Sequence, residues 1–557
     1  MRKVAHGTAD IVGVVLSGAT SMECECQLLE SAEKGKVREG MLIIVKSQNR
    51  NILARISQIV PYNDFYTEGD AFSEPRRRGL PIPDDVARKY EICKMELLME
   101  LPRAEVRYPP APGDPVVRLD PLKDVEQIFG VSSSQAGYVA YGTLVGYENL
   151  EVPLNVSNVT MHLAVFGVTG SGKSYNVGAL IEKLVCIPTQ NNEKVSYPMI
   201  IIDAHGDYTD YVEHVEKKNK LGEIGWIRRY VFPKAYENLE MRREGSLTQP
   251  IGINLDSISP RELAELIILY YKGTTEGSEL SVEGINVLFE NMAENGYESR
   301  HNIFVHHFDD LLTKLEQLEK EVISLPTKAA IARALQTFKS IEEKHNLLSV
   351  KSDLKEGVTF VDRITREGGI AILDFSADGA PGVDLKTKQF VMAYLATVLF
   401  EQFTNYKIRK EDRYLLFIIE EAQNFVPDKS YPIGMSLASN KLSAIATQGR
   451  KFGLSLCLIS QRPSFVDRIV LSMCNTFFIH RVSPEDVYFV KNVTGGLPAS
   501  IATRLTNLDT GDLILTGQMC PTPFPLLLHV RNSDRSVPHT IGRTDPISSL
   551  TKLRGLL

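Results

Sequence analysis

Residues 163–185 read LAVFGVTGSGKSYNVGALIEKLV. An apolar run, a glycine-rich loop and a helix-compatible stretch follow one another, which predicts a buried strand, a turn and a helix. The segment Gly167–Ser174 matches the phosphate-binding pattern G-x-x-x-x-G-K-[ST] in full. Its glycines let successive backbone N–H groups turn toward an anion at a helix start, where the helix dipole also favours negative charge. This stretch therefore predicts a parallel α/β core that binds a nucleoside triphosphate.

Within this loop we expect Lys173 to contact the β- and γ-phosphates of ATP and Ser174 to coordinate Mg²⁺. We expect the nucleotide to lie against the whole loop and the residue after it: Gly167, Val168, Thr169, Gly170, Ser171, Gly172, Lys173, Ser174 and Tyr175. A loop of this pattern with a purely structural role is the less favoured interpretation.

Further short apolar runs predict the other strands of the core sheet. They are almost continuously apolar, as strands buried on both faces of a parallel sheet are. The expected strands besides 163–166 are 199–203, 370–373, 415–419, 454–459, 476–479 and 513–515.

An acidic pair follows the strand expected at 415–419, in the segment YLLFIIEEAQNF. The strand end would deliver both carboxylates to the catalytic edge of the sheet. By position we assign Glu420 to the Mg²⁺ side, where Asp is more usual, and Glu421 to the base that orients the attacking water. A solvated loop would also carry two acids, but the phosphate loop favours the catalytic interpretation.

Two further residues flank the strand expected at 454–459. Gln461 follows the strand, where an amide could sense the γ-phosphate. Arg450 precedes it in GRKFG and is a candidate arginine finger, acting on the nucleotide of a neighbouring subunit. The alternative for Arg450 is a cation that interacts with the dipole of its own helix.

The rest of the chain is expected to form three additional parts. Closely spaced short strands predict a small β-barrel at 1–150. The α/β core then covers 151–210 and 350–531. A helical bundle is expected as an insert at 211–349, from a capping box at Ser259 and Glu262 and from apolar stripes at helical spacing over 311–322 and 331–341. We expect the tail, 532–557, to contact a neighbouring subunit.

Five blocks in this order, GVTGSGKSYN, IIDAHGDY, IIEEAQNF, GRKFGLSL and LISQRPS with NTFFIHRVSPED, resemble the HerA branch of the HerA–FtsK superfamily. The resemblance implies an α/β fold with a RecA-like P-loop core, an N-terminal β-barrel and a helical-bundle insert. It also implies a homohexamer that encircles double-stranded DNA and translocates on it by ATP hydrolysis. Carried over residue by residue, it assigns Lys173, Ser174, Glu420, Glu421, Gln461 and, in trans, Arg450.

Two departures from the family pattern stand out. Thr447 and Gln448 precede GRKFG where relatives often have Arg-Glu, and the stretch 62–90 is longer than expected. The block at 203–208, where Glu is common in place of Asp207, is expected at the active-site edge without an assigned role.

Composition restricts how the protein could bind DNA and in which cellular compartment it is expected. The chain of 557 residues has a net charge of −7, so any DNA binding must be local. Seven cysteines, an odd number spread along the chain, argue against a disulfide scaffold. With no signal sequence and no apolar run near the roughly 20 residues that span a membrane, we expect a cytoplasmic protein without a membrane partner.

The leading hypothesis is a DNA translocase that works with a nuclease of the NurA type, or with a defence effector. Two alternatives remain open: a ring-forming regulatory ATPase that holds a bound effector enzyme, and a secretion- or conjugation-type ATPase.

Overall fold

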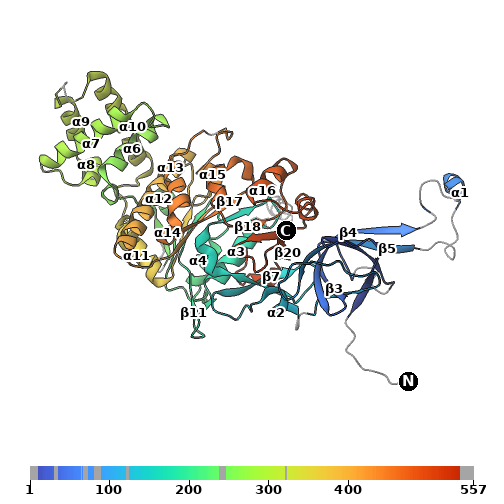
Figure 1. Cartoon of the computed structure of the whole chain (residues 1–557). Helices are drawn as coiled ribbons and strands as arrows, with labels where there is room; N and C mark the ends of the chain where they lie inside the picture. The colour runs from blue at the N-terminus through green and yellow to red at the C-terminus, as the bar shows by residue number, and fades with distance from the viewer. Residues whose placement is uncertain are drawn as a thin grey trace, which may run out of the picture.

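The computed structural model describes residues 10–30, 36–63, 66, 73–80, 89–120, 124–237, 246–319, 323–432 and 434–539. A barrel and a helical bundle lie at opposite ends of a central sheet with its covering helices (Figure 1). The fold is therefore the expected one: a RecA-like α/β core with an N-terminal barrel and a helical insert.

Six strands close the N-terminal barrel, in the order β1-β2-β5-β4-β3-β6. Alternate residues are buried, as in Cys24 and Cys26 of β2, because successive side chains point to opposite faces of a strand. All seven cysteines, every one of them described, are free. The strands are β1 (Ile11–Val15), β2 (Glu23–Leu28), β3 (Leu42–Ser47), β4 (Arg50–Asn63), β5 (Lys89–Glu100) and β6 (Pro115–Arg118).

The central sheet has the order β14-β13-β15-β12-β16-β17-β9-β18-β19-β20-β7-β8. All seven strands expected from the sequence belong to it, but β19 runs antiparallel to β18 instead of parallel. The bounds are β7 (Tyr138–Leu144), β8 (Glu151–Asn155), β9 (Leu163–Phe166), β12 (Met199–Asp203), β13 (Ile227–Val231), β14 (Thr248–Pro250), β15 (Ile370–Asp374), β16 (Leu415–Ile419), β17 (Leu454–Ser460), β18 (Thr476–Ile479), β19 (Asp512–Gly517) and β20 (Leu526–His529). A separate small hairpin pairs β10 (Ile187–Pro188) with β11 (Lys194–Val195).

Two expected domain boundaries differ from the sheet pairing. Strand β7, expected in the barrel domain that ends at 150, instead extends the central sheet through β20 and pairs with β8 at its edge. Strands β13 and β14, inside the stretch 211–349 expected to be helical, form the opposite edge of the same sheet. Alternating strand patterns predict strands, but which sheet a strand joins depends on long-range pairing.

The helical insert is a bundle of α6 (Pro260–Lys272), α7 (Glu279–Glu294), α8 (Arg300–His306), α9 (Phe308–Gln317) and α10 (Leu325–His345). The expected capping at Ser259 is present, since its hydroxyl accepts a hydrogen bond from the Glu262 N–H at 3.3 Å. The expected apolar stripe along α10, including Leu335 and Phe338, is buried. The stripe expected at 311–322 ends sooner, because α9 stops at Gln317, and Val322 lies outside the described residues.

The other helices cover the sheet or connect strands of the sheet and of the barrel. They are α1 (Ser73–Arg77), α2 (Asp124–Phe129), α3 (Lys173–Leu184), α4 (Asp210–Glu216), α5 (Pro233–Tyr236), α11 (Val358–Glu367), α12 (Leu385–Ile408), α13 (Ser439–Ala444), α14 (Arg450–Phe452), α15 (Arg468–Ser472), α16 (Val487–Val493) and α17 (Ala499–Ala502). A five-residue π-helix, Ile445–Gly449, joins α13 to α14. Among the described residues, no helix combines the length and apolar character needed to cross a membrane.

The first part of the C-terminal tail packs on its own chain. Arg535 is fully buried between the rings of Tyr175 and Tyr211, at 5.9 and 4.9 Å from their centroids. The Glu182 carboxylate of α3 accepts hydrogen bonds from the backbone N–H groups of Ser536 and Val537. Residues 540–557, for which a contact with a neighbouring subunit is expected, lie outside the described residues.

A buried cation joins the barrel to the core. The Arg55 side chain on β4 is 1% exposed, lies 3.3 Å from Glu96, and donates to the carbonyl of Pro525 in the core. Glu96 also accepts a hydrogen bond from Ser500 of the core at 2.8 Å. A desolvated charge is tolerated only when it is paired and hydrogen-bonded, so this contact ties the two parts together.

We expect Arg55→Met to lower the apparent Tm by at least about 5 °C, because it removes the buried cation that pairs with Glu96 and donates to the Pro525 carbonyl. Arg50→Met is the matched control on the same strand, since Arg50 forms a partly exposed ion pair with Glu100 at 3.5 Å. An exposed pair contributes about 1 kcal/mol or less. Differential scanning calorimetry checks both variants, and equal losses would contradict the buried junction.

Candidate functional site at the carboxyl edge of the sheet

The phosphate-binding loop connects β9 to α3 with the geometry that its sequence predicts. Gly170 and Gly172 have φ of 75° and 97°, values that favour glycine, and Gly172 is the N-cap of α3. A Cβ atom on Gly167 would lie 2.6 Å from the Ser171 hydroxyl, so this position has no room for a side chain. The loop is thus a compact anion site at the positive end of a 12-residue helix.

Backbone hydrogen bonds from neighbouring strands hold the loop in place. The Val168 N–H donates to the Arg481 carbonyl after β18 at 2.8 Å, and the Gly167 N–H donates to the Ser460 carbonyl at 3.3 Å. The Gly511 N–H donates to the Ser171 carbonyl at 3.2 Å. Because these partners come from three separate segments, the loop conformation depends on the sheet being assembled.

Lys173 begins α3 and lies near three acidic side chains. Its side chain is buried, and burial lowers the pKa of the ammonium group, while the carboxylates of Glu421, Glu420 and Asp207 oppose that shift. Ser174 and Tyr175, the next two residues of the helix, are half-buried. The ring of His539 lies edge-on to that of Tyr175, with centroids 6.5 Å apart.

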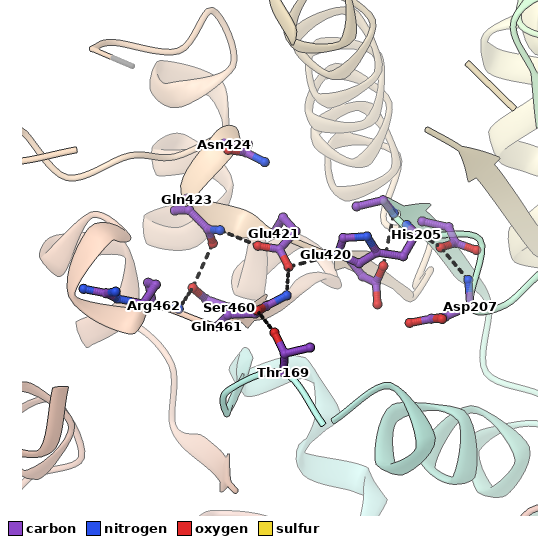
Figure 2. A network of polar contacts seen from close by, with 12 residues as sticks. Thr169, His205, Asp207, Glu420, Glu421, Gln423, Asn424, Ser460, Gln461 and Arg462 are labelled. Carbon is purple, nitrogen blue, oxygen red and sulfur yellow. Dashed lines mark hydrogen bonds and ion pairs between the residues drawn. The ribbon is translucent and has the colours of Figure 1, made fainter. Parts of the chain in front are cut away.

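The two acids after β16 point in different directions. Glu421 has φ of 48°, a left-handed conformation that is uncommon for a residue with a side chain. Glu420 is buried and accepts hydrogen bonds from the Tyr208 hydroxyl at 2.9 Å and the Ala204 N–H at 3.1 Å. Glu421 instead faces His205 and Gln461, so the pair divides between two environments (Figure 2).

Their protonation differs accordingly. Burial raises the pKa of Glu420 to about 7, and the nearby charge of Asp207 acts in the same direction. Burial also acts to raise the pKa of Glu421, but hydrogen bonds from His205, Gln423 and Gln461 outweigh it and leave that pKa below its ordinary value. Glu421 is therefore the ionised acid at neutral pH, as a group that accepts hydrogen bonds from a water should be.

Gln461 bridges the phosphate loop and the acid pair. Its amide nitrogen donates to Glu421 at 2.7 Å, and its amide oxygen accepts from the Thr169 hydroxyl of the loop at 2.5 Å. Figure 2 shows the chain of polar contacts from Thr169 through Gln461 to Glu421 and on to His205. A change in the loop when nucleotide binds would thus reach the candidate base through two hydrogen bonds.

The block at 203–208 lies beside the acids, and sequence reasoning left its role open. The buried Asp203 carboxylate accepts hydrogen bonds from four successive N–H groups, those of residues 205 to 208. The turn that results presents His205 at 3.1 Å from Glu421 and the Tyr208 hydroxyl to Glu420. Parallel pairing of β12 with β16 brings the block there, so its position directly after an apolar strand was the available signal.

Arg450 lies at the opposite edge of the sheet. It precedes β17, whereas Gln461 follows that strand. At about 3.3 Å per residue, the seven residues of β17 separate the two edges by roughly 20 Å. The exposed side chain of Arg450 therefore cannot reach the phosphate loop of its own chain.

The residues at the loop fit a magnesium ion carried by a nucleotide. The Ser174 hydroxyl and the carboxylates of Glu420 and Asp207 are hard oxygen donors, which Mg²⁺ prefers. Among the described residues, no group of three or more His, Cys, Asp or Glu side chains could hold a metal on its own. This suits Mg²⁺, which usually binds through one or two protein groups together with phosphate oxygens and water.

The sheet order and the residues gathered at its carboxyl edge place the chain among the P-loop ATPases with a RecA-like core. The family description "Helicase HerA, central domain" matches residues 139–398. The DNA double-strand break repair helicases HerA of Sulfurisphaera tokodaii and Sulfolobus acidocaldarius are 25% and 26% identical over 528 and 525 residues, covering 92% of each chain. The chain is thus similar to HerA helicases along most of its length.

Solved structures include a more distant similarity. VirB4 of Thermoanaerobacter pseudethanolicus aligns with a TM-score of 0.45 and 12% identity, over 72% of this chain and 98% of that one.

We expect Glu420→Gln to raise the apparent Tm of the nucleotide-free protein at pH 8. The pKa of Glu420 is raised in the fold, from 4.5 to about 7, so its ionisation costs stability as the pH rises through that interval. The amide avoids this cost, which is a few kcal/mol at most. The Tm difference should shrink toward zero as the pH falls from 8 to 5.

Glu421→Gln is the matched control for this measurement. The pKa of Glu421 is lowered in the fold, so its charge stabilises the protein above the ordinary pKa, and the amide should not raise the Tm at pH 8. A Tm difference for Glu420→Gln that is independent of pH would count against the assigned protonation.

Proposed function

We propose that this ATPase is a homohexameric translocase, or helicase, that moves on double-stranded DNA and works with a nuclease partner. The observation that carries the proposal is the chain of contacts from Thr169 through Gln461 to Glu421. It links nucleotide contact to the candidate base, as an enzyme that couples hydrolysis to movement requires. The relatives named above, which are repair helicases, support DNA as the substrate.

In the proposed reaction, Lys173 and those N–H groups of residues 167–174 that make no hydrogen bond within the fold hold the phosphates of ATP, and Tyr175 lies beside the nucleotide. Ser174 and Glu420 would hold Mg²⁺, which would neutralise charge on the phosphates when bound. Glu421 orients the attacking water, and Gln461 reports the presence of the γ-phosphate to it. His205 joins this set through its 3.1 Å contact with Glu421.

The position of Arg450 supports the proposed ring. An arginine that stabilises the transition state must reach the phosphates, and Arg450 lies one strand length from its own loop. A head-to-tail interface joins two different faces of the subunit, so it can bring the amino edge of one subunit to the carboxyl edge of the next. We assign Arg450 to the site of the neighbouring subunit on this ground.

DNA contact would be local and independent of sequence. Lys407, Arg409 and Lys410 are exposed in the turn between α12 and β16, on the same edge of the sheet as Arg450. Six copies around a channel would supply a set of cations despite the net charge of −7. The partner would be a nuclease of the NurA type or a defence effector.

Linear duplex DNA should stimulate the ATPase at low salt, and the stimulation should fall as salt rises, because phosphate contacts release counterions.

Lys173→Ala should reduce turnover by at least about 100-fold with or without DNA, since it removes the charge that faces the phosphates. A phosphate-release assay measures both. Stimulation by a partner protein but not by duplex would favour the regulatory-ring alternative, and unreduced turnover in Lys173→Ala would refute the site.

Mixed rings test the shared site. Arg450→Ala and Glu421→Gln subunits should each be inactive alone, with Arg450→Ala costing about 10³-fold or more. In a random mixture, about a quarter of the interfaces would pair an intact carboxyl edge with an intact Arg450, and ATPase activity should recover to that extent. Native mass spectrometry confirms that mixed rings form, and their inactivity would show that Arg450 does not act in trans.

A further inference from the structure

The two oxygens of the Glu421 carboxylate have different surroundings. Oε1 accepts a hydrogen bond from the Gln461 amide at 2.7 Å and lies 3.1 Å from a ring nitrogen of His205. In the described part of the chain, Oε2 accepts one hydrogen bond, from the side-chain amide of Gln423 (Figure 2). Each carboxylate oxygen can accept about two hydrogen bonds. Oε2 is therefore the oxygen that can still accept a hydrogen bond from a water molecule.

A backbone N–H group sets the direction of the hydrogen bonds that lead to Oε2. The N–H of Arg462 can only donate, and it donates to the Ser460 hydroxyl oxygen at 3.0 Å. The Ser460 hydroxyl in turn donates to the amide oxygen of Gln423 at 2.8 Å. With its oxygen held in this way, Gln423 presents its NH2 group to Glu421, and rotating the amide by 180° would break both contacts.

The residues in this chain of hydrogen bonds are buried and held from several sides. Ser460 is 1% exposed and Gln423 is 6% exposed. Ser460 is the last residue of β17, and its carbonyl accepts the N–H of Gly167 in the phosphate loop. The Arg462 guanidinium lies 3.6 Å from the buried carboxylate of Asp486, so the segment after β17 is anchored as well.

The two partners of Oε1 are held less firmly. Gln461 also accepts a hydrogen bond from the Thr169 hydroxyl of the phosphate loop, so contact with a nucleotide can change its position. The His205 side chain is 51% exposed. Glu421 itself has a left-handed φ of 48°, a conformation that persists only where surrounding contacts impose it. A buried partner anchored to the sheet, as Gln423 is, can hold the carboxylate when the other two contacts change.

We propose that Gln423 is a positioning residue for Glu421 and that Ser460 acts through it. Gln423 fixes the orientation of the carboxylate and leaves Oε2 with one acceptor site for the attacking water. Oε1 keeps the contacts with Gln461 and His205. The inference rests on the proposed role of Glu421 as the residue that orients this water, and it adds two residues that act on the reaction only through that carboxylate.

Two substitutions of Gln423 test this role. Gln423→Met removes both hydrogen bonds of the amide, so we expect kcat to fall about 10- to 100-fold at unchanged KM for ATP. An imidazole can accept from Ser460 on one nitrogen and donate to Glu421 from the other, so Gln423→His should recover much of the lost kcat. Phosphate-release kinetics measure kcat and KM, and calorimetry shows that each variant is folded. A Met variant as active as the unsubstituted protein, or a His variant no faster than the Met variant, would overturn the proposal.

Ser460→Ala tests the chain of hydrogen bonds, with Ser455→Ala as the matched control. Both hydroxyls are buried on β17, but Ser455 donates to the Leu415 carbonyl at 3.3 Å, near the other end of the strand. We expect Ser460→Ala to lower kcat about 3- to 10-fold, the effect of one neutral hydrogen bond, and Ser455→Ala to leave it unchanged. In the Gln423→Met background, Ser460→Ala should cause no further loss, because its route to Glu421 is already absent. Independent, multiplying losses would contradict an action of Ser460 through Gln423.

Glu421→Gln separates the failure of this inference from the failure of the proposed function. We expect Glu421→Gln to be inactive with either Gln or Met at position 423. If Glu421→Gln turns over ATP at the full rate, the assigned base fails, and the proposed site fails with it. If Glu421→Gln is inactive while Gln423→Met turns over ATP at the full rate, the positioning role alone fails.

Discussion

Strand β17 hydrogen-bonds to β9 on one side and to β16 on the other, and the rest of the site depends on this placement. Its register pairs Ser460 with Phe166 and Leu458 with Ile419. In a parallel sheet all three strands therefore end at one edge, with the phosphate loop, Gln461 and the acid pair side by side. No single segment of the chain contains the site, and the ladder of buried backbone hydrogen bonds assembles it.

The same edge gathers charge that the fold alone does not neutralise. Lys173 faces Glu420, Glu421 and Asp207 in a buried setting, and the pKa of Glu420 is raised to about 7 as a result of burial. A bound phosphate with its divalent cation would neutralise the charges of both signs, because the phosphate would pair with Lys173 and the cation with the carboxylates. Without a ligand, these buried charges therefore lower the stability of the folded protein, and binding of the ligand would relieve that cost.

The sequence predicted those features that are local. The phosphate loop, the buried strands and the acids after β16 follow from short patterns whose physical meaning needs no partner. The contact of His205 with Glu421 did not follow, because it depends on the pairing of β12 with β16 across more than 200 residues of chain. Membership of β7, β13 and β14 in the central sheet was missed for the same reason, since the pattern of a strand does not say which strands it pairs with. The π-helix at Ile445–Gly449, directly before Arg450, was also missed, because no sequence pattern distinguishes it from an α-helix.

Strands β17 and β9 connect the two edges of the sheet mechanically. At their carboxyl ends, β17 is followed by Gln461 and β9 by the phosphate loop. At their amino ends, β17 is preceded by Arg450 and β9 by His162. Short strands buried within a hydrogen-bonded sheet move as rigid units, so the two ends cannot shift independently by much. If each ATP site combines the carboxyl edge of one subunit with the amino edge of the next, a subunit's nucleotide state biases the arginine it offers to its neighbour. Sequential ATP hydrolysis around such a ring would then need no additional structural element to couple the subunits.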